Sequence, residues 1–208
     1  MTVRSVIVYM CPKTKEEFQE IREARREDIE QAALKCFAAN GYHATTISQI
    51  AKEAGVSKGL MYNYFTSKDE LLSVLFLKFS EEIMQRLDPD SNQVIDDREA
   101  EEFVDKYLDF IKEKREYCKL FIQISVQPGI MDMLIQGEVG KKAMKNQMIM
   151  NEYFTRLSKG NAEVDLMFFT SLIKGFTLQY VFAPEMITKA QIRGIKEMLL
   201  VILNRKRR

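Results

Sequence analysis

The segment TTISQIAKEAGVSKGLMYNYFTSK, residues 45–68, constrains the fold of this chain more than any other stretch. Thr46 and Gln49 form a capping-box pattern that begins a helix, and apolar residues then recur at helical spacing along one face. Gly55 can adopt a positive φ, which ends this helix in a tight turn, and Ser57 can cap a second short helix. The pattern predicts a helix-turn-helix.

The second of these predicted helices has an outward face that suits a DNA groove. Met61 and Phe65 share its inward side. The other positions supply one lysine, two tyrosines, an asparagine and a glycine without a side chain, which is typical of a recognition helix. An ordinary helical hairpin inside another all-helical fold is the alternative, because helix-turn-helix patterns are short and degenerate.

A longer segment, Ile29 to Leu72, resembles the DNA-binding domain of the tetracycline-repressor (TetR) family of bacterial transcription regulators. The matching landmarks are Ala33, Phe37, Gly41-Tyr42, Thr45-Thr46, Ile50-Ala51, Ala54-Gly55-Val56-Ser57, Tyr62, Tyr64-Phe65 and Lys68. The resemblance implies an N-terminal three-helix DNA-binding domain, a linking helix, and a C-terminal regulatory and dimerisation domain. It also implies a homodimer that binds a pseudo-palindromic operator in double-stranded DNA and is released by a small-molecule effector, with repression more typical than activation.

Matching the chain to the family motif assigns a set of residues to DNA contact. These are Thr45, Thr46, Ser57, Lys58, Gly59, Leu60, Tyr62, Asn63, Tyr64 and Lys68. Lys58, in the first turn of the recognition helix, and Lys68, just beyond it, are expected to contact phosphates. We expect the isobutyl group of Leu60 to contact a thymine methyl group, with packing against the neighbouring helix as the alternative.

Positive charge in this chain is local rather than global. The 208 residues include 31 basic and 30 acidic side chains, so no global field attracts the protein to nucleic acid. Between residues 40 and 68, three lysines accompany a single glutamate. This balance predicts modest non-specific affinity for DNA, with a dimer doubling the contacts.

The residues that usually carry catalysis or bind metals are sparse. Cys11, Cys36 and Cys118 are odd in number, far apart and without metal-ligand spacing, which predicts a reduced, cytoplasmic protein. His43 has no cysteine or acidic partner close in sequence, and no glycine-rich phosphate loop occurs. We therefore expect no catalytic residue, metal ligand or cofactor, and no enzyme activity. No apolar run is long enough to predict a membrane span.

Helical periodicity continues from residue 14 to the end, with no strand pattern after residue 13, so the predicted fold is all-α. We divide the chain into an N-terminal extension (1–21), a helix-turn-helix DNA-binding domain (22–72) and an effector-binding and dimerisation domain (73–208). A capping-box pattern at Ser67 begins a linking helix that should end at Asp88-Pro89, before a polar loop.

The first half of the N-terminal helix lacks a clear core stripe. We interpret it as a solvated helical arm. The alternative is that Arg22, Arg25 and Arg26 reach a DNA phosphate or the minor groove.

The second domain is expected to bind an effector that is largely apolar. The 12 Met, 13 Phe and 8 Tyr of the whole chain suit an adaptable apolar pocket, although such residues also simply fill cores. The candidate lining residues are Tyr107, Phe110, Tyr117, Phe121, Met131, Met148, Tyr153, Phe168 and Phe169. A closed cavity there would favour sensing of a small molecule, whereas a filled core would favour control by a protein partner.

The last two predicted helices are apolar enough to require cover on more than one side. The resemblance implies that they pair with their copies in a second subunit as a four-helix bundle, and burial within one subunit is the alternative. The candidate interface residues are Leu172, Phe176, Tyr180, Ile192, Ile195, Leu199 and Ile202.

Overall fold

The computed structural model describes residues 14–158 and 160–203, and all regular structure in these ranges is helical. The apolar run at residues 6–11, Cys11 and the basic end at 204–208 lie outside them. The elements are α1 (Lys15–Asn40), α2 (Ile47–Glu53), α3 (Lys58–Met61), α4 (Lys68–Leu87), α5 (Asp97–Glu113), α6 (Arg115–Ser125), α7 (Ile130–Gln136), α8 (Glu138–Leu157), α9 (Ala162–Phe182), the 3-10 turn η1 (Pro184–Met186) and α10 (Lys189–Leu203). The predicted all-α fold is confirmed.

The helix ends follow the capping signals in the sequence. Thr14 and Thr46 each form a complete capping box, and α1 ends at Gly41 with φ 78°. At α4 only half of the expected box forms: Ser67 accepts a hydrogen bond from the Glu70 N–H at 3.0 Å. The Glu70 carboxylate instead accepts from the N–H and hydroxyl of Thr66, each at 2.6 Å. Local sequence therefore fixes most helix boundaries in this chain.

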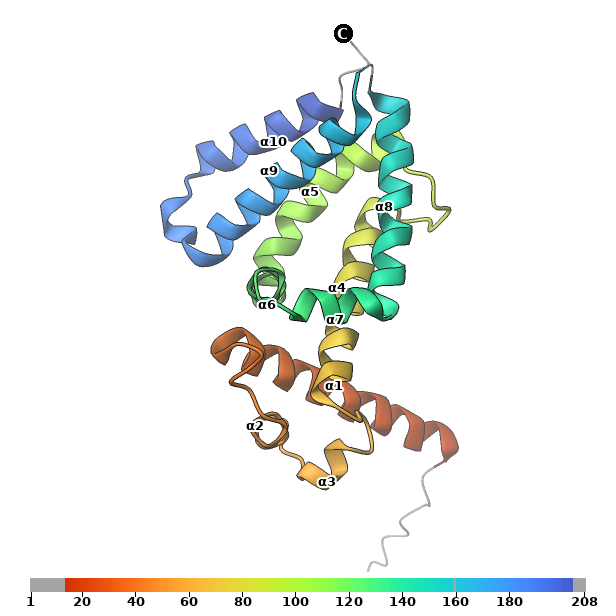
Figure 1. Ribbon diagram of the computed structural model, residues 1–208, viewed down its shortest axis with the longest axis vertical. Coiled ribbons are helices and arrows are strands. Elements are labelled where there is room, and N and C mark those ends of the chain that lie inside the picture. The colour runs from red at the N-terminus through yellow and green to blue at the C-terminus, as the bar shows by residue number, and fades with distance from the viewer. Residues whose placement is uncertain (1–13, 159, 204–208) are drawn as a thin grey trace, which may run out of the picture.

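The helices form two groups that share α4 (Figure 1). Helices α1 to α3 lie at one end, and α4 runs from them into the larger helical group, where it packs against α5 and α8. Helices α9 and α10 lie side by side, with α10 also contacting α5. The predicted domain boundary at residue 72 falls within α4, so this one helix belongs to both groups.

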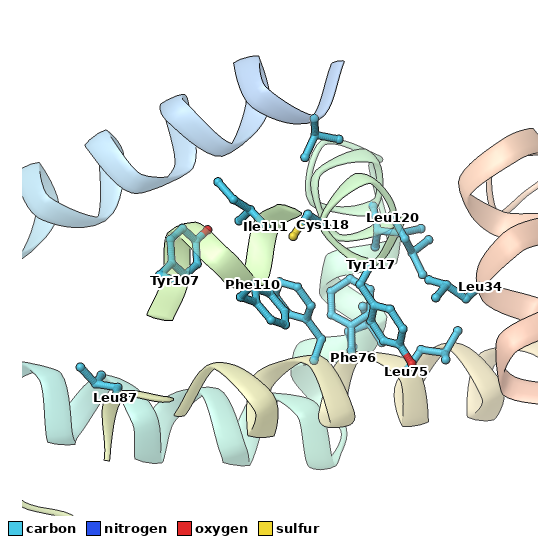
Figure 2. Packing of buried hydrophobic residues seen from close by; sticks show 14 of the residues in the cluster. Leu34, Leu75, Phe76, Leu87, Tyr107, Phe110, Ile111, Tyr117, Cys118 and Leu120 are labelled. Carbon is cyan, nitrogen blue, oxygen red and sulfur yellow. The ribbon is translucent and has the colours of Figure 1, made fainter. Parts of the chain in front are cut away.

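A single hydrophobic core extends from α1 to α10. Leu34 of α1, Leu75 of α4 and Leu120 of α6 belong to it, and all three are at most 4% exposed. Figure 2 shows them near Tyr117 of α6, where α1 packs against α6. Burial of each such side chain contributes about 1.5–3 kcal/mol, so this joint couples the small helical group firmly to the large one.

Within the described residues, no single helix has the length and hydrophobicity to cross a membrane. Helices α6 and α7 reach that threshold only when taken together, as a pair bent by 100°.

Candidate DNA-binding surface and regulatory domain

The predicted helix-turn-helix is formed by α2, a turn and α3. Gly55 in the turn has φ 64°, and the Ser57 hydroxyl caps α3 by accepting from the Leu60 N–H at 3.1 Å. Met61 is fully buried and Phe65, in the turn after α3, is 1% exposed. Both belong to the hydrophobic core and anchor α3, which packs against α2. Because α3 has only four residues, these anchors rather than its own hydrogen bonds hold it in place.

The side of α3 and of the turn after it that lies opposite the anchors is open to solvent. Lys58, Gly59 and Asn63 are exposed, and Leu60 and Tyr62 are 38% and 48% exposed. A Cβ placed on Gly59 would meet no atom within 4 Å. The absence of a side chain at this position is therefore not required by packing within the subunit.

Three residues from the predicted DNA-contact set are turned inward. Thr45 is 1% exposed, and its hydroxyl donates to the carbonyl oxygens of Gly41 at 2.7 Å and Cys36 at 3.1 Å. Tyr64 is only partly exposed. The Lys68 ammonium donates to the carbonyl oxygens of Tyr42 at 2.8 Å and Thr45 at 2.9 Å.

These contacts change the roles expected of Thr45 and Lys68. The Lys68 Nζ also lies 4.2 Å from the centroid of the Tyr42 ring, and burial lowers the pKa of its ammonium group. Two of its three donors are thus occupied within the protein. Lys68 therefore joins the loop before α2 to the start of α4, and the Thr45 hydroxyl joins the same loop to the end of α1.

Two arginines of α1 lie over aromatic rings in the segment just after α3. The guanidinium carbon of Arg26 lies 4.9 Å from the Phe65 ring centroid, and that of Arg22 lies 5.7 Å from the Tyr64 ring centroid. Neither partner was identified from the sequence. The sequence does place Arg22 and Arg26 four residues apart, on the side of α1 where the buried residues begin at Ile29, and this spacing was the available signal.

Glu30 is a buried charged residue at the joint of the two helical groups. It is 1% exposed, its carboxylate accepts from the Arg26 Nε at 3.2 Å, and it also pairs with Lys78 of α4. This carboxylate therefore ties the helix that supports α3 to the linking helix.

The predicted effector-site residues divide into a packed group and an exposed group. Tyr107, Phe110, Tyr117, Tyr153 and Phe169 are buried, whereas Phe121 and Met131 are partly buried. Phe121 stacks on Phe79 with 4.6 Å between ring centroids. Phe110 meets Phe79, and Phe169 meets Phe154, in tilted contacts with centroids 5.6 and 5.5 Å apart. Met148 and Phe168 are 65% and 52% exposed, so the structure does not bring them to this group.

Two tyrosines in this packed group differ in how their hydroxyls are satisfied. The Tyr107 hydroxyl lies 2.6 Å from the Thr177 Oγ1, while burial raises the pKa of Tyr107. The Tyr153 hydroxyl is buried without a hydrogen-bond partner among the described residues. An unpaired buried hydroxyl is costly, whereas the Tyr107 hydroxyl is satisfied within the protein.

A hollow lies between α9, η1 and α10. Its volume is about 1070 Å³, and it opens to solvent. The side chains that line it include Phe168, Phe176, Met186, Ile195, Met198 and Ile202.

The predicted dimer-interface residues do not all face outward. Phe176, Leu199 and Ile202 are 6% or less exposed within one subunit, and Leu172, Tyr180, Ile192 and Ile195 are partly buried. The exposed apolar side chains of these two helices are instead Val164, Met167, Phe168, Leu178, Phe182, Met198 and Val201. Helices α9 and α10 are apolar on several sides, so periodicity alone did not separate the two sets.

The comparisons with known proteins agree with this geometry. The family model described as bacterial regulatory proteins, tetR family, matches residues 29–75. Over these residues the chain is similar to the DNA-binding domain of TetR-family regulators. Among curated TetR relatives, the regulator HbdR of Aromatoleum sp. (strain CIB) is 56% identical over 50 residues, which are 24% of this chain and 22% of HbdR. The fatty acid metabolism regulator protein of Bacillus subtilis (strain 168) is 40% identical over 62 residues, 30% of this chain and 32% of that protein.

The solved TetR structures extend the likeness to the second domain as a likeness of fold. The structure of FadR from Bacillus subtilis in complex with stearoyl-CoA has a TM-score of 0.68 at 18% identity, covering 86% of this chain and 98% of that one. The chain spans less than a third of the length of these two curated relatives. The family and these relatives are transcription regulators rather than enzymes.

Proposed function

We propose that this chain is a transcription regulator that binds a pseudo-palindromic operator as a homodimer and is released by a small-molecule effector. The observation that carries the proposal is the open face of α3, with no neighbour over Gly59 in a helix held by buried anchors. Two such helices about one DNA turn apart would enter successive major grooves. Selection from a random DNA library should return two inverted half-sites, and a set without shared sequence would refute specific recognition.

Gly59→Ala tests the close approach of α3 to DNA. In the free protein a methyl group has space at this position, and alanine favours a helix, so stability should be unchanged or rise by up to about 1 kcal/mol. At the duplex the same methyl group should overpack the contact, weakening operator binding by about 1–3 kcal/mol, which is about 5- to 150-fold. Thermal melting and fluorescence anisotropy measure the two effects. Unchanged affinity would place Gly59 away from the duplex.

The variants Lys58→Ala and Lys68→Ala should distinguish a lysine that contacts DNA, Lys58, from one that stabilises the fold through internal hydrogen bonds, Lys68. The exposed Lys58 is free to neutralise a phosphate, so its loss should lower the slope of log affinity against log salt by about one unit per subunit. Lys68→Ala removes two internal hydrogen bonds and should lower stability by about 1–3 kcal/mol while leaving the slope nearly unchanged. A reduced slope for Lys68→Ala instead would restore its predicted phosphate contact.

The exposed apolar side chains of α9 and α10 support a homodimer. Leu178, Phe182, Met198 and Val201 are each about half exposed, and the hollow beside them is apolar. Pairing these helices with their copies would cover both features, as in a four-helix bundle. This arrangement also provides the two recognition helices that a pseudo-palindrome requires.

An apolar effector is supported by two observations. The FadR structure that this fold resembles is a complex with stearoyl-CoA, and the Tyr153 hydroxyl offers an unpaired polar group inside an apolar domain. The close packing of the aromatic rings favours the alternative, control by a protein partner. A thermal-shift screen of fatty acids and acyl-CoA thioesters distinguishes the two alternatives. A ligand that raises the melting temperature, and does so less in Tyr153→Phe, supports sensing of a small molecule. No shift with any compound supports control by a protein partner.

Coupling between the two domains would pass through the joint of α1, α4 and α6. Leu34 and Leu120 belong to one buried cluster, so a displacement of α6 would be transmitted to α1 and thence to α3. The coupling free energy can be no larger than the difference in effector affinity between the two states, typically about 1–3 kcal/mol.

A further inference from the structure

The loop that joins α4 to α5 has a pattern of oxygen-bearing side chains. Together with the first turn of α5 it makes up twelve residues, 88–99, which read DPDSNQVIDDRE, with Asp88, Asp90, Asn92, Asp96 and Glu99 at the first, third, fifth, ninth and twelfth positions. Twelve-residue calcium loops between two helices take their ligands from these same positions, together with the backbone carbonyl oxygen of the seventh. Here the seventh residue is Val94, and the sixth is Gln93 in place of the usual glycine.

The backbone around this loop follows the arrangement that such a pattern needs. Helix α4 ends at Leu87, directly before the first position, and Asp96 at the ninth position caps α5. Gln93 has φ 67°, the left-handed conformation that glycine normally supplies at the sixth position, and its N–H donates to the Asp88 Oδ2 at 2.9 Å. The loop projects beside α8 in Figure 1.

The acidic side chains of the loop converge. One oxygen from each of Asp88, Asp90 and Glu99 can be chosen so that all three lie within 4.8 Å of one another. Asp88 and Glu99 are each only 5% exposed. Three carboxylates this close repel one another unless a cation lies between them.

Asp88 supplies an independent indication of a missing ligand. Its Oδ1 is buried and has no hydrogen-bond partner among the described residues. The residue as a whole is only 5% exposed, so solvent does not satisfy this oxygen. A buried carboxylate oxygen without a partner costs several kcal/mol, and a bound cation would satisfy it directly. The neighbouring Lys142 is paired with Glu81 at 3.4 Å instead.

We propose that residues 88–99 form a calcium-binding site. Asp88, Asp90, Asn92 and Glu99 would provide side-chain oxygens, Val94 its carbonyl oxygen, and Asp96 a ligand through water. An all-oxygen set of this size suits Ca²⁺, which takes six to eight oxygens, better than Mg²⁺, which keeps several waters. The ion would join the end of the linking helix α4 to the start of α5. A search for cysteine and histidine spacing overlooks such a site.

Calorimetric titration of the full chain, freed of metals with EDTA, tests the proposal. CaCl₂ should bind at one ion per chain with a Kd of about 10–100 µM, weaker than sensor loops that have glycine at the sixth position. In 1 mM CaCl₂ the melting temperature should rise by roughly 3–10 °C. The site would be overturned if CaCl₂ produced no heat of binding and no shift in the melting temperature, as expected if Lys145, which lines the same hollow as Asp88, neutralised the cluster. An equal response to 1 mM MgCl₂ would overturn the assignment to calcium.

Two variants in the same loop locate the ion. Glu99→Gln keeps an oxygen that can accept from the Asp96 N–H but removes the charged ligand, so the Kd should rise about tenfold or more. Asp97→Asn is the matched control, because Asp97 is exposed, lies in the loop and occupies a position that supplies no ligand. Its Kd should stay within about twofold of the parent. Equal weakening by the two variants would indicate diffuse attraction to acidic residues and would contradict a built site.

Discussion

Met198→Glu combined with Val201→Glu should convert the protein to folded monomers and weaken operator binding by about 100-fold or more, because the second half-site no longer adds to the first. Both side chains project from α10 and are 51% and 57% exposed in one subunit, so glutamate costs little in the monomer. In a dimer interface the same carboxylates would be buried without partners. Sedimentation, circular dichroism and anisotropy with operator DNA measure assembly, folding and binding.

The matched control replaces exposed apolar residues elsewhere. Val126→Glu with Met144→Glu alters side chains that are 75% and 65% exposed outside α9 and α10, and should leave assembly unchanged. Phe176→Glu is a poor probe of the interface, since Phe176 is 6% exposed and its replacement should unfold the subunit itself. A double variant on α10 that stays dimeric would remove this face from the interface.

Arg26→Ala combined with Lys78→Ala should lower the free energy of unfolding by about 3–5 kcal/mol, because Glu30 then remains buried and charged without a partner. The two cations are 41% and 42% exposed and can return to water, so Glu30→Leu alone should cost much less. Urea unfolding at pH 7 measures each variant.

Adding Glu30→Leu to the double variant provides the decisive comparison. If the stranded carboxylate is the cause of instability, the triple variant should recover most of the lost free energy. A triple variant as unstable as the double would show that Arg26 acts through its contact with the Phe65 ring instead. The same set, assayed on DNA, reports whether the position of α3 depends on this cluster.

Features set by neighbouring residues could be predicted from the sequence. The caps at Thr14 and Thr46, the turn at Gly55 and the helix break at Pro128-Gly129 all depend on residues a few positions apart. The outward face of α3 followed from the inward anchors Met61 and Phe65 in the same way.

Features set by distant parts of the chain could not be predicted in this way. Lys68 binds carbonyl oxygens 23 and 26 residues earlier, and Arg26 meets Phe65 across the fold. Whether Phe176 or Val201 faces the subunit's own core depends on how α9 and α10 pack, since both helices are apolar on several sides. The sequence indicated that these two helices are unusually apolar, but not which face of each helix packs on the subunit's own core and which stays exposed.

The continuous core between α1 and α6 limits how the DNA-binding part can be exchanged between regulators. A chimaera that joined residues 14–67 to another protein's second domain would lose Tyr117 and Leu120, which lie over Leu34 in Figure 2. Leu34 would then meet side chains that were not selected to fit it, at a cost comparable to a large core substitution, about 2–5 kcal/mol. Grafted recognition in this architecture therefore requires the matching surface of α6 as well as the helix-turn-helix.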